Sequence, residues 1–80
     1  MRIDKYLKIA RIIKRRAIAK DACDQGKVSV NGKNVKAGYE VKIGDLIEID
    51  FGTRSFNGEV LEIKEHVTKE SAREMYRVIE

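Results

Sequence analysis

The chain has 80 residues, of which 42% are hydrophobic and 38% are charged, a balance typical of one small folded domain. One cysteine and one histidine exclude an internal disulfide and supply too few ligands for a zinc site. No apolar run exceeds three residues, far short of the roughly 20 that span a bilayer, and the N-terminus opens with charge. We therefore expect a cytoplasmic protein with no membrane partner and no bound metal.

Charge is distributed unevenly along the chain. Residues 1–36 hold eleven Lys or Arg against three acids, a balance of +8, whereas residues 37–80 hold six against ten, a balance of −4. A basic half of this density attracts polyanions, and an acidic half limits non-specific binding. A solvated, lysine-rich surface without a partner is the alternative, and composition does not separate the two.

Two short helices are predicted in the basic half, because apolar residues recur there at helical spacing in two stretches. The first stripe is Ile3, Leu7, Ala10 and Ile13, and the second is Ile18, Ala19, Ala22 and Cys23. Three consecutive cations at 14–16 predict a break between the helices near Lys14. Gly26 is expected to follow the second helix, since the residue after a last turn often adopts positive φ. The predicted core residues are Ile3, Leu7, Ile13, Ile18 and Ala22.

Short strands are predicted after Gly26. Val28–Val30 alternates as a strand, and the Asn31-Gly32 dipeptide favours a type I′ hairpin turn. Gly44-Asp45 marks a second turn, after which residues 46–51 read as a strand with alternate residues facing outward. Residues 52–55 are expected to turn the chain into another strand over 56–63. Within it, Asn57-Gly58 predicts either a bulge or a hairpin turn, and the sequence does not decide between them.

The last residues predict a short helix, because four apolar side chains are spaced by three, one and three residues: Ala72, Met75, Tyr76 and Ile79. Ser71 and Glu74 resemble a capping box, with Thr68 as the alternative cap. The predicted fold class is α+β, in which an N-terminal pair of short helices packs on a small, mainly antiparallel β-sheet and a short helix ends the chain. We expect a single domain over residues 1–80.

Catalytic sites find little support. His66 is the only histidine, and it lies in a charged, exposed stretch without a serine or cysteine nucleophile signature nearby. The carboxylate pairs Asp45/Glu48 and Glu59/Glu62 are explained by polar faces of turns and strands. The glycines lack the spacing of a phosphate-binding loop. We therefore expect no enzymatic activity and no cofactor.

The basic side chains form the candidate site, because two helices that meet near Lys14 place their cations on one face. The candidate RNA-binding residues are Arg2, Lys5, Lys8, Arg11, Lys14, Arg15, Arg16, Lys20 and, at the hairpin, Lys33. Arginine grips phosphate bidentately or stacks on a base, and lysine adds a mobile charge. A rigid surface of this kind is expected to recognise the backbone of a folded RNA more than its sequence.

Two further residues of the first helix have open roles. Tyr6 either stacks on a base or packs beside Ala10, and helical position does not separate these readings. Asp4 is expected to cap the first helix and to orient Arg2 or Lys5.

Four ordered motifs resemble the RNA-binding domain first described in ribosomal protein S-four, also called the alpha-L motif. They are RIDKYL at 2–7, RR at 15–16, QGKVSVNGK at 25–33 and VKIGD at 41–45. The resemblance covers about residues 1–50 and leaves 51–80 as a β-hairpin and tail extension. Among stand-alone members, the chain is similar to the small heat-shock RNA-binding proteins and to the RqcP proteins of Gram-positive bacteria, through to residues 72–79.

This resemblance implies an RNA-binding factor of ribosome-associated quality control. Such a factor binds the separated large ribosomal subunit through ribosomal RNA and P-site tRNA, and supports a partner protein that adds alanine tails to stalled nascent chains. It also implies that the cations of the two helices contact RNA. One departure is Ala17, where many relatives carry a hydroxyl residue, so we expect a different cap on the second helix. We expect a monomer.

Two other classes remain open. The basic face fits a ribosome-assembly factor or another protein-interaction module whose partner is acidic. Two helices followed by strands also fit a winged DNA-binding domain, although the alanine-rich second helix offers few side chains that could read base edges.

Overall fold

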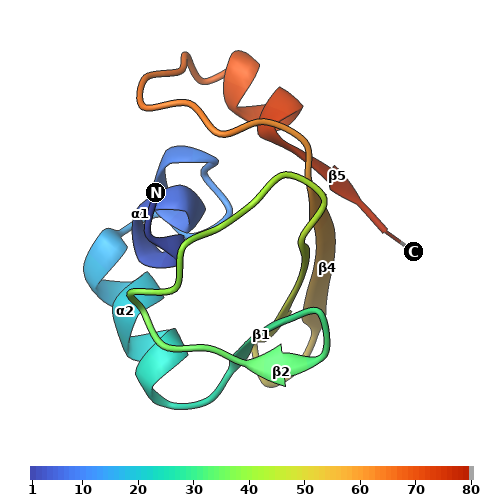
Figure 1. Ribbon diagram of the computed structural model, residues 1–80. Coiled ribbons are helices and arrows are strands. Elements are labelled where there is room, and N and C mark those ends of the chain that lie inside the picture. Colours follow the sequence, from blue (N-terminus) through green and yellow to red (C-terminus); the bar gives the residue numbers. More distant parts are fainter. Residues whose placement is uncertain (80) are drawn as a thin grey trace.

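The computed structural model describes residues 1–79. Its elements are helices α1 (Ile3–Ile9) and α2 (Arg16–Asp24), strands β1 (Val28–Val30), β2 (Lys33–Asn34), β3 (Leu46–Asp50), β4 (Ser55–Val60) and β5 (Tyr76–Val78), and a 3₁₀ helix, η1 (Ser71–Met75). The strands form one antiparallel sheet in the order β2-β1-β3-β4-β5. Both helices lie on the same side of this curved sheet (Figure 1). The predicted α+β architecture is confirmed.

The break between the helices is confirmed, and its backbone cause is visible. Helix α1 ends at Ile9, and Arg11 then adopts a left-handed φ of 61°. The amides of Ile12 and Ile13 both donate to the carbonyl of Leu7, which closes the turn and keeps Ile13 buried. At the end of α2, Gly26 takes a φ of 75°, as expected for a residue after the last helical turn.

The buried stripe of α2 differs from the prediction. Ile18 was expected in the core but is 54% exposed, whereas Ala19 and Cys23 are fully buried. The helix buries its small side chains instead, which lets α2 pack closely against α1. Ala22 is half-buried beside this core.

The first hairpin forms as predicted. Asn31 and Gly32 have φ values of 52° and 86°, the two left-handed positions that a type I′ turn requires, and Val30 pairs with Lys33. Strand β3 also alternates as expected, with Ile47 and Ile49 buried and its other three residues exposed. It ends at Asp50, because Gly52 already turns the chain with a φ of 89°.

A buried acid ties the two turns together. Asp45 accepts hydrogen bonds from the Asn31 side chain at 3.1 Å, from the Tyr39 hydroxyl at 2.9 Å and from the amide of Lys42 at 2.9 Å. Burial and the bond to Asp45 raise the pKa of Tyr39. The Asn31 side chain in turn accepts from the amide of Leu46. These bonds give Asp45 a structural role.

Asn57-Gly58 is neither a bulge nor a turn. Strand β4 runs through both residues in regular register, with Asn57 opposite Glu48 and Gly58 opposite Ile47. A Cβ at position 58 would lie 2.6 Å from the Phe56 ring, so a larger residue here would force that ring to move. The predicted strand over 56–63 is also three residues too long at its end, since β4 stops at Val60.

The predicted C-terminal helix is partly wrong. A 3₁₀ helix spans Ser71–Met75, but Tyr76–Val78 forms strand β5 against β4. Burial of Met75 anchors the segment, and pairing with the open edge of β4 then overrides the helical spacing. The expected Ser71–Glu74 capping box is absent, and Ser71 instead exchanges hydrogen bonds with Thr68. None of the helices in residues 1–79 has the length and apolarity needed to cross a membrane.

Candidate nucleic-acid interface

One buried carboxylate joins the starts of both helices. Asp4 accepts hydrogen bonds from Nε and Nη2 of Arg2, each at 3.2 Å, and lies 3.5 Å from the guanidinium of Arg16. Its predicted capping role is wrong, because the N-cap of α1 is Arg2 and no side chain caps the helix. Its predicted role in orienting Arg2 is confirmed, and the second cation it orients is Arg16 rather than Lys5.

The three side chains differ in exposure. The Asp4 side chain is 3% exposed, whereas those of Arg2 and Arg16 are 46% and 47% exposed. A guanidinium carries five N–H donors, so each arginine keeps donors for a second anion while Asp4 fixes its position. We call this cluster the arginine pair. It is held in place before any ligand arrives.

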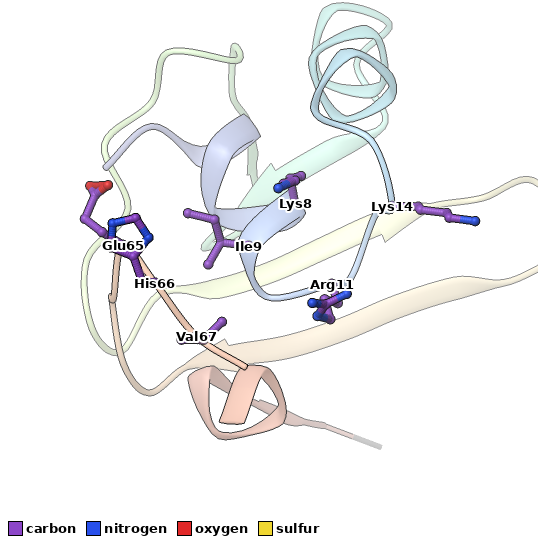
Figure 2. Close-up of a pocket in the computed structure, with 7 residues that line it drawn as sticks. All are labelled: Lys8, Ile9, Arg11, Lys14, Glu65, His66 and Val67. Atoms are coloured by element: carbon purple, nitrogen blue, oxygen red, sulfur yellow. The ribbon is translucent and has the colours of Figure 1, made fainter. Parts of the chain in front are cut away.

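A second cluster lies along α1 and the link to α2. Lys8, Arg11 and Lys14 line one side of an open cavity of about 510 Å³. Figure 2 shows that Glu65, His66 and Val67, from the segment after β4, form the other side. We call the three cations the link cluster. The two clusters are neighbours along the chain, because Lys14 stands two residues before Arg16 and Asp4 stands four residues before Lys8 on α1.

The remaining predicted cations are placed differently. Lys5 donates to Glu65 at 2.5 Å, which lowers the pKa of that carboxyl, and Lys20 lies 3.9 Å from Asp24. Arg15 is exposed at the start of α2. Lys33 lies on β2, at the edge of the sheet, and belongs to neither cluster.

Tyr6 belongs to the core. Its ring is fully buried and its hydroxyl donates to the carbonyl of Met75 at 2.6 Å, so the packing alternative is correct and base stacking is not. Burial also raises the pKa of Tyr6. His66 is exposed, as predicted. The different cap expected on α2 is not found, because its N-cap residue, Arg15, makes no side-chain cap and Ala17 lies inside the helix.

Sequence reasoning missed two contributions to this surface. Glu65 and His66 face the link cluster from a segment more than fifty residues further along the chain. Arg54, in the turn after β3, lines a smaller cleft together with Arg11. For Arg54 the sequence offered one local signal, a phenylalanine and an arginine that flank a glycine turn at 51–54.

Comparison with known proteins gives consistent results along the chain. Residues 1–47 match the family model "S4 domain". A protein of Halalkalibacterium halodurans named RQC P-site tRNA stabilizing factor is 49% identical over 78 residues, which cover 98% of this chain and 89% of that protein. A protein of the same name from Streptococcus pneumoniae is 47% identical over 79 residues, covering 99% and 90%.

A solved structure agrees with this relationship. The structure of Heat Shock Protein 15 from Vibrio cholerae, described as trimeric, superposes with a TM-score of 0.91 at 30% identity, covering 99% of this chain and 81% of that one. The resemblance inferred from the four sequence motifs is thereby confirmed. The chain belongs to the S4 domain family and is similar, over nearly its whole length, to the RQC P-site tRNA stabilizing factors.

Proposed function

We propose that this protein is an RNA-binding factor of ribosome-associated quality control. In this role it binds the separated large ribosomal subunit through ribosomal RNA and P-site tRNA, and supports a partner that adds alanine tails to stalled nascent chains. The observation that carries the proposal is the presence of the arginine pair and the link cluster on a chain whose near-full-length relatives are named P-site tRNA stabilizing factors.

The physical argument concerns the positions of the cations before RNA binds. Side chains that are fixed in advance lose less conformational entropy when they bind phosphate. Asp4 fixes Arg2 and Arg16, and the left-handed turn at Arg11 brings Arg11 beside Lys8 and Lys14. The arginine pair and the link cluster supply five cations, and Arg15, which stands between Lys14 and Arg16 and is exposed at the start of α2, supplies a sixth. This arrangement suits a folded RNA read by shape.

The proposal also states how the protein acts, where it acts and in which oligomeric state. The protein acts by binding rather than by catalysis, in the cytoplasm, as a monomer and as one RNA-binding unit over residues 1–80. The related Vibrio cholerae protein is described as trimeric, so the oligomeric state is a direct test. Sedimentation of the free protein at several concentrations is expected to give the mass of one chain.

Salt dependence of RNA binding tests the electrostatic part. With about six phosphate contacts, log K is expected to fall with log salt at a slope of about −4 to −5. Lys14→Gln or Arg15→Gln should each reduce the magnitude of the slope by about 1, with little change in stability because both side chains are exposed. Arg73→Gln, an exposed arginine of η1 outside both clusters, is the matched control. A slope near zero would contradict the proposal.

Cell fractionation tests the biological part. The tagged protein is expected in the large-subunit fraction of a sucrose gradient, and nuclease treatment should release it. Absence from that fraction, or an association with a protein partner that survives nuclease, would count against ribosomal RNA and tRNA as ligands.

A further inference from the structure

A second cleft opens on the other side of Arg11. It has a volume of about 320 Å³ and lies between the link after α1, the β3–β4 turn and β5. Its walls carry two arginines, Arg11 and Arg54, and three aromatic rings, Phe51, Phe56 and Tyr76. Among the described residues that line it there is no carboxylate. The cleft is therefore both aromatic and cationic.

The rings of this cleft are held in place. Phe56 and Tyr76 meet edge to face, with centroids 5.5 Å apart and planes at 70°. Phe56 also lies against Gly58, which leaves no room for another side chain. Phe51 is 41% exposed, and the guanidinium carbon of Arg54 lies 5.8 Å from its ring centroid. An exposed ring beside an arginine, on a fixed aromatic wall, offers a stacking surface.

Arg11 connects the cleft to the RNA-binding surface. Its φ of 61° is uncommon for a residue with a side chain, and it allows Arg11 to line both the cavity of the link cluster and the aromatic cleft. Figure 2 shows Arg11 on the link that leads away from α1. A phosphate held by the link cluster thus lies next to a surface suited to the adjacent base.

We propose that this cleft binds a single unstacked nucleobase of the RNA whose backbone lies on the link cluster. The inference rests on the proposed function and extends the interface beyond residues 1–47, to Phe51, Arg54 and Tyr76. A nucleotide joins a flat, aromatic base to a phosphate. The aromatic rings of the cleft can stack on the base, and its arginines can bind the phosphate. A purely apolar partner would gain nothing from two arginines, and an acidic peptide would gain little from the rings.

Three RNA duplexes test the inference. The first carries one bulged adenine, the second carries an abasic nucleotide at the same bulge, and the third is fully paired. The wild-type protein is expected to bind the adenine bulge roughly fivefold to hundredfold more tightly than the abasic bulge, because stacking on an aromatic ring contributes a factor of that size. Phe51→Ala is expected to remove most of this difference and to leave the salt slope unchanged.

Further variants separate binding from folding. Phe51→Leu keeps an apolar side chain but no π-face, so it should lose the preference for adenine while its melting temperature stays close to that of the wild type. Arg11→Gly accepts the left-handed φ without strain and should keep the fold within about 5 °C of the wild-type melting temperature, yet lose the preference. Ile43→Ala, a 70% exposed apolar residue outside the cleft, is the control and should change neither.

The outcomes distinguish the inference from the proposed function. Equal binding of the adenine and abasic bulges by the wild type, with the steep salt dependence intact, would overturn the nucleobase site and leave the proposed function standing. Retention of the adenine preference by both Phe51 variants would overturn the site as well. Weak, salt-independent binding of all three duplexes would overturn both.

Discussion

Replacing Asp4 by asparagine tests how the arginine pair is built. The change keeps the shape of the side chain but removes the charge that holds Arg2 and Arg16. Asparagine also presents an NH₂ group to one guanidinium, where the carboxylate presents an oxygen. Asp4→Asn is therefore expected to reduce both stability and RNA affinity.

The magnitude follows from burial. Removing one partner of a fully buried ion pair costs about 3–5 kcal/mol. Here the carboxylate is 3% exposed, but both guanidinium groups are nearly half exposed and stay hydrated after the change, which lowers the cost to about 2 kcal/mol. For a domain of this size that corresponds to a melting temperature lower by about 8–16 °C. Two arginines that are no longer fixed should lower RNA affinity about tenfold.

Asp21→Asn is the matched control, because it makes the same charge change at an exposed acid of α2. Both variants gain one unit of net positive charge, so any general increase in RNA attraction cancels in the comparison. Urea unfolding gives the free energies, and RNA titration well below the melting temperature gives the affinities. If Asp4→Asn is no less stable than Asp21→Asn and binds RNA equally well, Asp4 does not organise the site.

Three further changes probe the core and the first turn. Tyr6→Phe should lower the free energy of unfolding by about 1 kcal/mol, measured in urea, because the Met75 carbonyl keeps two backbone donors after losing the hydroxyl. Burial and, to a lesser extent, nearby carboxylates raise the pKa of the Cys23 thiol from 9.0 to about 11. The thiol therefore ionises at lower pH in the unfolded chain than in the folded protein. The free energy of unfolding should fall by about 2–3 kcal/mol as the pH rises from 9 to 11. A flat profile in thermal melts over this range would contradict that reasoning, and Cys23→Ala should show a shallower fall. Asn31→Ala should cost about 1–2 kcal/mol through the lost bonds to Asp45 and to the Leu46 amide and through the left-handed φ, whereas Asn31→Gly should cost less because it loses only the two bonds.

Local patterns predicted the local structure well. The spacing of Ile3, Leu7 and Ala10 identified the buried face of α1, and consecutive cations near Lys14 identified the break after it. Asn31-Gly32 identified the type I′ hairpin. Each of these features depends on a few neighbouring residues, whose backbone preferences act before any distant contact forms.

Three predictions failed where a contact with a distant part of the chain decided the structure. Tyr76 carried helical spacing but became part of β5, since the free edge of β4 offers hydrogen bonds that the helix pattern does not reveal. Ile18 was assigned to the core by its stripe, but the small face of α2 packs there instead. Asn57-Gly58 left a bulge and a hairpin turn open, whereas pairing with β3 makes both residues part of the regular strand β4.

The candidate site shows the same division. From the sequence alone came the chain's separation into a basic and an acidic half, the nine candidate cations and the resemblance to the S-four type domain. The tertiary structure alone grouped Arg2 with Arg16 around Asp4, placed Tyr6 in the core and brought Arg54 and Arg11 to one cleft. Charge and spacing are properties of the order of residues, whereas the pairing of distant side chains depends on how the helices cross the sheet and which groups become buried together.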